Sequence, residues 1–209
     1  MNLENRVRRK IKKYKPKGKL AETAIIFLET SAINHSSVKY HSMGTALLSE
    51  DVARIRKKDK KAAFFAGLLH DYGKIFLPKD LFDGHDITDE EYQEVKRHAM
   101  IGFWALENRH LFIAMCVGLH HALYDKGYGL TIRDFPNNLG AGTVEKVLKI
   151  AAIVSICDFI NSFTTRTTKI KDGSDKISNN LEEMLMEKYP NDLGVVKDAL
   201  FVLKKSNFQ

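Results

Sequence analysis

The stretch that decides the fold is Ala62-Ala63-Phe64-Phe65-Ala66-Gly67-Leu68-Leu69-His70-Asp71-Tyr72-Gly73-Lys74. Its apolar run predicts a buried helix, and the His70-Asp71 pair falls where that helix meets a polar pocket. Lys74 follows one helical turn later. An adjacent imidazole and carboxylate can serve two metal ions at once, because the carboxylate can bridge them while the imidazole fixes one side. The pair therefore indicates the chemistry of dinuclear hydrolases.

A His-Asp pair at a helix end also has a plainer interpretation, a buried histidine beside a polar helix terminus. The remaining candidates argue against it, because each interrupts or ends a segment that otherwise has the pattern of a core. They are His41, His98, His120, His121 and Asp158. Burying so many imidazoles and carboxylates without partners would cost several kcal/mol each, so we expect them to share one partner. A metal cluster would satisfy them all.

The order of these residues resembles the HD-domain metal-dependent phosphohydrolases. It runs His, then His-Asp followed by Lys, then His with Gly four residues later, then His-His, then Asp. The resemblance covers roughly residues 38–170. It implies an all-α fold, a helical bundle with a dinuclear metal site in its core.

Four segments look more narrowly like the HD-GYP branch, whose members hydrolyse cyclic dinucleotides. They are Leu69-His70-Asp71-Tyr72-Gly73-Lys74-Ile75, Pro78-Lys79-Asp80-Leu81, Ile87-Thr88-Asp89-Glu90-Glu91 and His98-Ala99-Met100-Ile101-Gly102.

The chain departs from that branch at its signature. The branch pattern reads His-His-Glu, two variable residues, Asp-Gly, one variable residue, then Gly-Tyr-Pro. Here Ala122 replaces the Glu, one residue near Asp125 is missing, and Gly129 replaces the Pro. A later Asp-variable-variable-Asp-Ala element has Asn161 and Ser162 as its last two residues. These changes concern substrate choice, whereas every expected metal ligand remains.

The resemblance also implies a ligand set for each ion, with Asp71 bridging. One ion takes His41, His70, Asp71 and Asp158, and the other takes Asp71, His98, His120 and His121. Some family members hold a third ion through a carboxylate four residues before the first His. That position is Ser37 here, which favours two ions.

Imidazole and carboxylate ligands suit divalent transition-metal ions, with iron or manganese favoured and zinc, cobalt or nickel as alternatives. Two such ions would lower the pKa of a bridging water toward neutrality, so that a metal-bridging hydroxide could attack phosphorus in line with the leaving oxygen. Besides Asp71, we expect Lys74 to act in catalysis by neutralising charge on the phosphoryl oxygens. A favourable cation at a helix end is the alternative role for Lys74.

Substrate-binding candidates lie in and after the altered loop, although each could equally be surface. They are Asp125, Lys126, Tyr128, Arg133 and Arg166. His35, His85 and His110 fall outside the matched motif and are expected at the surface or at helix ends. Trp104, Phe64 and Phe65 are expected in the core.

Periodicity predicts helices throughout, and alternating strand patterns are scarce. The expected helices are Leu20–Ala32, Val38–Arg56, Lys60–Leu69, Thr88–Ala99, Gly102–Glu107, Arg109–Leu123, Thr143–Phe163, Ser178–Glu187 and Asp192–Leu203. We expect Gly73, with a positive φ, to end the helix that delivers His70. Tyr124–Gly142 has five glycines or prolines in nineteen residues, which predicts a loop placed to cover a site.

The 209 residues and 44% apolar content suit one catalytic domain. We assign residues 1–19 to a basic tail, 20–175 to the HD (HD-GYP-like) domain, and 176–209 to helices that pack on the same domain. The sequence contains no run of about 18 apolar residues, so we expect no transmembrane segment. Cys116 and Cys157 lie in apolar segments, which favours reduced, buried thiols in a cytoplasmic protein.

The formal charge of +7 comes from the N-terminus. Residues 1–19 carry nine lysines or arginines and one acidic residue, Glu4, so this segment holds +8 and the rest of the chain −1. Such a segment could contact nucleic acid or anionic lipid. A solvated linker is favoured, because Pro16 and Gly18 interrupt it and no aromatic pattern suggests base stacking.

The first functional hypothesis is a phosphodiesterase that hydrolyses a cyclic dinucleotide, with cyclic di-GMP as the leading candidate in a signalling role. An HD phosphohydrolase acting on a mononucleotide or another phosphomonoester is the first alternative. A non-catalytic nucleotide-binding or regulatory HD module is the second, and Ala122 and Asn161 favour it. A homodimer is compatible with the sequence.

Overall fold

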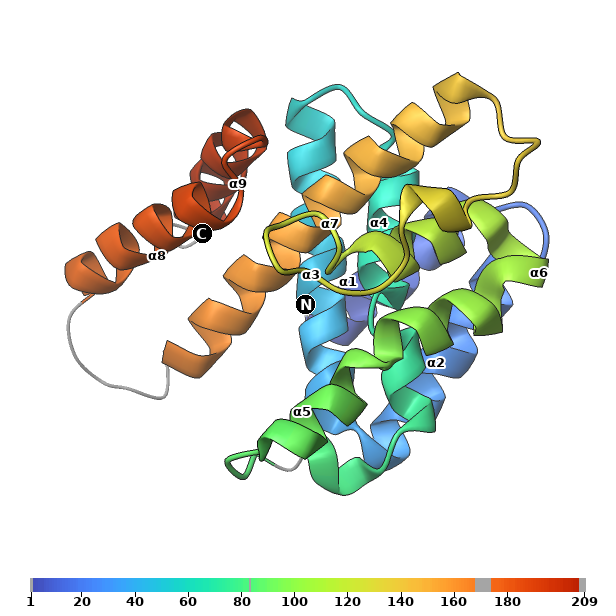
Figure 1. The fold of residues 1–209 in the computed structure, drawn as a ribbon, viewed down its shortest axis with the longest axis horizontal. Helices are drawn as coiled ribbons and strands as arrows, with labels where there is room; N and C mark the ends of the chain where they lie inside the picture. Colours follow the sequence, from blue (N-terminus) through green and yellow to red (C-terminus); the bar gives the residue numbers. More distant parts are fainter. Residues whose placement is uncertain (1, 83, 168–173, 207–209) are drawn as a thin grey trace.

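The helices of this chain form a bundle around one buried core, and Figure 1 shows their arrangement. The computed structural model describes residues 2–82, 84–167 and 174–206, which contain helices and connecting segments but no strand. The α-helices are α1 Leu3–Tyr14, α2 Leu20–Asn34, α3 Ser36–Ile55, α4 Lys60–Leu69, α5 Asp89–Lys96, α6 His98–Leu119, α7 Ala141–Thr167, α8 Ser174–Lys188 and α9 Leu193–Ser206. Short 3-10 helices lie at Tyr72–Phe76, Lys79–Phe82 and Ile132–Asp134. The all-α prediction is confirmed.

The centre of the bundle is built from α3, α4 and α7, each of which packs against the other two. Helix α4 carries the decisive apolar run, and Phe64, Phe65 and Leu68 on it are fully buried. Asp59 caps its first turn by accepting a hydrogen bond from the backbone N–H of Ala62 at 2.9 Å. Burying both faces of α4 fixes the position of its C-terminal end, where His70 and Asp71 follow.

Helix α7 is long and apolar enough to cross a membrane by length and composition alone, over residues 141–165. Most of its apolar window, 61%, is buried inside the bundle, which is typical of a core helix. It packs against α3, α4 and α6 and carries Asp158 on a buried face. It is the one such helix among the described residues.

Helix α6 is bent at His110, whose φ of −149° and ψ of 59° are not helical. A straight helix of this length would separate its ends by roughly 30 Å. Instead, Nε2 of His98 at its start lies 3.3 Å from Nε2 of His120 just after its end. The element is therefore a hairpin of two arms, as the separate predicted segments Gly102–Glu107 and Arg109–Leu123 indicated.

Gly73 has a different role from the expected one. Its φ is not positive, because the positive-φ glycines of the described chain are Gly18, Gly84 and Gly129. A Cβ at Gly73 would instead lie 2.0 Å from the backbone oxygen of His98. Glycine is needed here because the segment after α4 packs directly on the backbone of α6.

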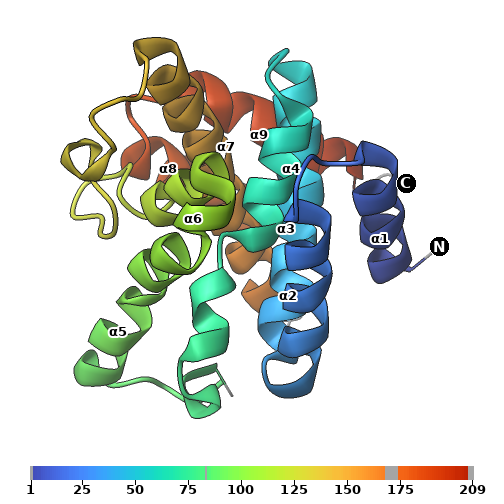
Figure 2. The same ribbon diagram turned by 90° about the vertical axis from the view of Figure 1, so that its right-hand side faces the viewer.

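Two further expectations are wrong. Trp104 is exposed on α6, whereas Phe64 and Phe65 are buried as predicted. The N-terminal segment is a helix, α1, which packs on α2 and α3 at one edge of the bundle (Figure 2). Its Val7 and Ile11 are buried in the common core.

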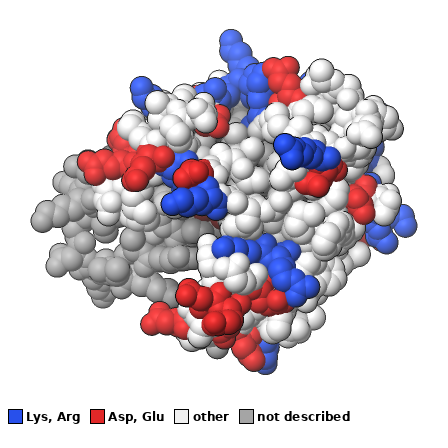
Figure 3. Space-filling model, in the orientation of Figure 1, with Lys and Arg blue, Asp and Glu red and all other residues white. Residues whose placement is uncertain are grey.

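The cations of α1 are partly used inside the fold. Nζ of Lys10 lies 2.6 Å from the buried carboxylate of Glu50, which also accepts a hydrogen bond from Tyr14. A buried carboxylate without such partners would be unfavourable, so Lys10 contributes to the stability of the fold. The solvated-linker interpretation does not hold for this helix. On the face shown in Figure 3, basic and acidic side chains are interspersed.

Candidate metal centre

Seven side chains from five segments converge on one buried point. Helix α3 supplies His41, the end of α4 supplies His70 and Asp71, and α7 supplies Asp158. The bend of α6 brings its two ends together, so that His98 lies beside His120 and His121. These are the seven residues predicted as metal ligands, and the structure gathers all of them.

Asp71 lies between two groups of histidines. Its Oδ2 is 3.3 Å from Nε2 of His70 and 3.8 Å from Nε2 of His41. Its Oδ1 faces Nε2 of His98 at 3.3 Å. A carboxylate whose two oxygens face separate imidazole groups has the arrangement that bridging two cations requires.

Asp158 completes the centre from the side of α7. Its Oδ1 lies 2.8 Å from Nε2 of His41 and 3.5 Å from Nε2 of His70. Its Oδ2 is 4.0 Å from Nε2 of His121. Asp158 therefore contacts the histidines expected for one ion and approaches one expected for the other.

The ring orientations of three histidines are fixed by the backbone. Nδ1 of His70 donates to the carbonyl of Gly67 at 2.8 Å, and Nδ1 of His98 donates to the carbonyl of Val95 at 2.6 Å. His120 makes the same bond to a carbonyl three residues earlier. Because Nδ1 carries the proton, the Nε2 lone pair of each ring is directed into the centre.

His41 is held by Asn161, which stands where the Asp-variable-variable-Asp-Ala element has its second Asp. Nδ2 of Asn161 donates to the carbonyl of His41 at 2.8 Å and lies 3.0 Å from its Nδ1. Gly44 makes room for this amide, since a Cβ there would lie 2.7 Å from Oδ1 of Asn161. Asn161 thus contacts a predicted metal ligand.

The charges of the centre suit metal binding. Burial lowers the pKa of His98 to about 4 and that of His120 to about 3, and the pKa of His121 also falls well below its ordinary value. Three neutral imidazoles are therefore available at neutral pH. For Asp158, burial acts to raise the pKa, but hydrogen bonding and charge from His41 and His70 outweigh it and keep the carboxyl ionised.

His70 and Asp71 form a charged pair when no cation is bound. Burial acts to lower the pKa of His70, but the carboxylates of Asp71 and Asp158 outweigh it and raise this pKa to about 10. Burial likewise acts against ionisation of Asp71, yet His70, Lys74 and His98 hold its pKa well below the ordinary value. A bound cation would replace the proton on His70.

The geometry fits metal ions rather than a closed hydrogen-bond network. Oδ1 of Asp71 is buried without a hydrogen-bond partner among the described residues. Two pairs of Nε2 atoms also face each other, at 3.1 Å between His41 and His70 and at 3.3 Å between His98 and His120. With His98 and His120 both neutral, the lone pairs of the second pair face each other, and a cation held between them would satisfy both.

Three overlapping groups of these side chains have ligand atoms within 4.8 Å of one another. They are His41, His70 and Asp71; His98, His120 and His121; and His70, His120 and Asp158. The first two are subsets of the ligand sets expected for the two ions. One or more divalent cations can therefore be held here.

The centre opens to solvent on one side. His41, His121 and Asp158 are partly exposed, whereas His70, Asp71 and His98 are not. Nζ of Lys74 lies 2.8 Å from Oδ2 of Asp71 and its side chain is also partly exposed. The predicted catalytic lysine is thus a cation at the mouth of the centre.

The loop after His121 brings two tyrosines to this mouth. The Tyr128 ring lies 4.6 Å from the ring of His121, and the Tyr124 hydroxyl is 3.0 Å from Nδ1 of the same histidine. Tyr128 was predicted as a substrate contact, whereas Tyr124 was not singled out. The prediction that this loop covers a site agrees with these contacts.

The other predicted substrate-binding residues are not gathered at the centre. Asp125, Lys126 and Arg133 are exposed, and no described contact joins them to it. The side chain of Arg166 lies outside the described residues.

Two lysines lie next to these tyrosines, and the sequence analysis did not single them out. Nζ of Lys188 on α8 lies 3.4 Å from the centre of the Tyr124 ring, and Nζ of Lys96 on α5 lies 5.8 Å from that of Tyr128. Their positions depend on how α5 and α8 pack, and no motif in the sequence marks them.

Comparison with known proteins points to one family. The profile of the HD domain family matches residues 38–159, and no curated protein matches the chain. The fold is similar to that of the HD domain of the L. monocytogenes phosphodiesterase PgpH, with a TM-score of 0.63 at 15% identity over 88% of this chain and 99% of that one. The same domain in complex with cyclic-di-AMP gives a TM-score of 0.62 at 16% identity, over 86% and 96% of the two chains.

Proposed function

Because this chain belongs to the HD domain family and is a metal-dependent phosphohydrolase, we propose that it is a phosphodiesterase whose substrate is a cyclic dinucleotide. One observation carries the choice of substrate class: two pairs of a lysine with a tyrosine flank the partly exposed His121 of the metal centre. A cyclic dinucleotide offers two phosphates and two bases to such a mouth.

The centre has the parts that phosphodiester hydrolysis needs. His41, His70, Asp71, His98, His120, His121 and Asp158 would hold two divalent cations, which supply Lewis acidity toward a water and toward a phosphoryl oxygen. The backbone bonds to Nδ1 of His70, His98 and His120 hold the ligand nitrogens in place without rearrangement.

Lys74 complements this centre from the solvent side. Its ammonium is paired with Asp71 at 2.8 Å and stays partly exposed, so it can also approach a phosphoryl oxygen at the mouth. Negative charge grows on such oxygens as phosphoryl transfer proceeds, and a fixed cation stabilises it. We assign this role to Lys74.

The two lysine-tyrosine pairs would bind the rest of the substrate. An ammonium can pair with a phosphate, and a tyrosine ring offers a face on which a base can stack. Lys188 also lies 5.3 Å from the centre of the Phe159 ring, and Lys96 lies 4.6 Å from that of Tyr92. Each lysine therefore lies against two aromatic rings.

The choice of base has two sources of support. The HD-GYP resemblance of the sequence favours cyclic di-GMP, whereas the similar solved structure binds cyclic-di-AMP. Both carry purines that the tyrosine faces can accept. We therefore propose the substrate class and test the two nucleotides side by side.

The test is a substrate panel on manganese-loaded protein, with cyclic di-AMP, cyclic di-GMP, the linear dinucleotides and purine mononucleotides. We expect a cyclic dinucleotide to be opened, with turnover lost in His70→Ala. Phosphate release from mononucleotides while both cyclic dinucleotides stay intact would contradict the proposal and favour the phosphomonoesterase alternative. Tight binding of a cyclic dinucleotide without turnover would contradict it in favour of the regulatory module.

Substitutions of the flanking lysines test the recognition step. In Lys96→Ala and Lys188→Ala we expect a KM raised about threefold or more, because each loses a phosphate contact next to apolar surface. The exposed Lys197 on α9 gives the matched control, for which KM should not change. Equal KM values for all three variants would contradict the assignment of Lys96 and Lys188 to the substrate site.

A further inference from the structure

A cavity lies apart from the metal centre, near the ends of α4 and of the second arm of α6 that are far from the predicted ligands. Its volume is about 570 Å³, within the range of small-molecule sites. The start of α4, the bend of α6 and the connection between α1 and α2 form its walls. None of the seven predicted ligands lines it.

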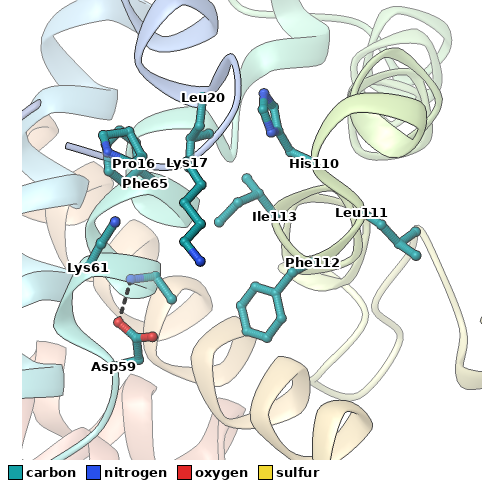
Figure 4. Close-up of a pocket in the computed structure, with 11 residues that line it drawn as sticks. Pro16, Lys17, Leu20, Asp59, Lys61, Phe65, His110, Leu111, Phe112 and Ile113 are labelled. Atoms are coloured by element: carbon teal, nitrogen blue, oxygen red, sulfur yellow. Dashed lines mark hydrogen bonds between the residues drawn. The ribbon is translucent and has the colours of Figure 1, made fainter. Parts of the chain in front are cut away.

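The lining combines apolar surface with free positive charge (Figure 4). Leu20, Phe65, Phe112 and Ile113 contribute apolar surface. In Figure 4 the Lys17 side chain extends between these walls.

The charges in the cavity favour an anion. Lys17 and Lys61 both line it, and neither makes an ion pair among the described residues. Asp59, whose Oδ1 accepts the capping hydrogen bond from Ala62, is the one carboxylate in the lining, so the two lysines leave an excess of one positive charge. Two unpaired ammonium groups beside aromatic and aliphatic side chains complement a ligand with one negative group and an apolar body.

We propose that this cavity is a ligand site for a small organic anion with an apolar body, and that its occupancy is coupled to the metal centre. Two helices connect the places. Helix α4 lines the cavity with Ala62 and Phe65, and His70 follows its last residue. The second arm of α6 lines it with Phe112, and His120 follows its last residue.

The connection along each helix is short and stiff. His70 lies eight positions after Ala62, and His120 lies eight positions after Phe112, which corresponds to roughly 12 Å along each axis. The two helices pack on each other. A ligand that separates the start of α4 from the start of the second arm of α6 would therefore shift their C-terminal ends, because packed helices move as rigid elements. His70, Asp71, His120 and His121 follow those ends.

The binding test uses anilinonaphthalene sulfonate, a fluorescent anion with an apolar body, and its neutral analogue phenylnaphthylamine. We expect one sulfonate probe to bind per chain. The pair Lys17→Gln with Lys61→Gln should weaken sulfonate binding about fivefold, because two partly solvated ion pairs are lost. Binding of the neutral analogue should not change.

Two controls locate the probe. The pair Lys12→Gln with Lys13→Gln removes the same charge from exposed positions of α1 and should leave the affinity unchanged. Ala62→Leu fills part of the cavity and should weaken both probes, with folding checked by circular dichroism. The proposed site would be contradicted if the probe did not bind stoichiometrically, or if neither the lysine pair nor Ala62→Leu changed its affinity. The lysine variants keep the test decisive if Ala62→Leu does not fold.

The coupling test measures Mn²⁺ binding by calorimetry with and without saturating sulfonate probe. We expect the Mn²⁺ affinity of the wild-type protein to change about fivefold or more, which is the lower end of typical allosteric coupling. The Lys17→Gln with Lys61→Gln pair, at the same probe concentration, should show a smaller change. Equal Mn²⁺ affinities with and without the probe would overturn the coupling, and this readout does not depend on any substrate.

Discussion

Gly73 shows that backbone contact, as well as ligand chemistry, shapes the metal centre. The segment that follows Asp71 touches the first turn of α6, and a Cβ on Gly73 would lie 2.0 Å from the carbonyl oxygen of His98 and 2.8 Å from the backbone nitrogen of Gly102. Both obstacles are backbone atoms, so neither can rotate away. The positions of Asp71 and His98 are thus linked through a contact that only glycine allows.

Gly73→Ala is predicted to destabilise the fold by about 1–3 kcal/mol or more, because the methyl group must push the two segments apart. The free energy of unfolding from urea titration measures this. Gly142→Ala is the matched control, since nothing lies within 4 Å of a Cβ there, and it should not lower the free energy of unfolding. Equal stabilities of the two variants would contradict the contact.

Lys74→Gln is predicted to lower kcat about tenfold or more while leaving the metal content unchanged. The ammonium at the mouth is lost, but every expected ligand remains. Steady-state kinetics with a cyclic dinucleotide and metal analysis of the same sample test both parts. Lys79→Gln removes an exposed cation nearby and should behave as wild type. A variant with unaltered kcat, or with no metal, would argue against the assigned role.

At the level of single residues, the sequence identified the seven side chains that the structure gathers, but it did not indicate which residues pack around them. Histidine and aspartate are common metal ligands, and their order and spacing were sufficient to predict that they belong to one site. Asn161, Tyr124 and Lys188 are common surface residue types, and they gain a role only when α7, the loop after His121 and α8 pack together. Such contacts depend on tertiary structure, which no local pattern encodes.

At the level of elements, helix positions were predictable and helix packing was less so. The Thr88–Glu91 capping box begins α5 as expected, and both predicted segments of α6 are present. The N-terminal segment was wrongly predicted to be a solvated tail, because lysines and arginines dominate its composition. Val7 and Ile11 nevertheless recur at helical spacing, and this was the available signal that the segment packs on the core.

Ile11→Ala is predicted to reduce the free energy of unfolding by about 2–5 kcal/mol, because Ile11 is buried in the common core. Chemical denaturation of the full chain gives the value. Ile33→Ala makes the same change at a position that is 79% exposed, so stability should shift by less than about 0.5 kcal/mol. If α1 were solvated, the two variants would instead have similar free energies of unfolding.

Across the whole molecule, the buried histidines make the stability of the metal-free protein depend on pH. The lowered pKa values of His98 and His120 mean that the unfolded chain binds more protons than the folded one between about pH 6.5 and pH 4, so acidification in this window favours unfolding. The raised pKa of His70 stabilises the fold below about pH 6.5, and this contribution is lost as the pH rises toward about 10.

We therefore predict that the urea midpoint of chelator-treated protein is highest near neutral pH and falls toward about pH 4.5 and toward about pH 10. Saturating Mn²⁺ should raise the midpoint near neutrality, since cations that bind the folded state stabilise it. A midpoint that stays constant from about pH 7 to about pH 4.5 would contradict the buried, neutral state of these histidines.

The central claim is that one buried centre holds two divalent ions across Asp71. The most direct test is the metal content of protein purified without added metal and then equilibrated with manganese or iron, for the wild-type chain and Asp71→Ala. We predict two ions per wild-type chain and at most one in the variant. A wild-type chain that holds no metal, or an Asp71→Ala chain that keeps both ions, would contradict the account.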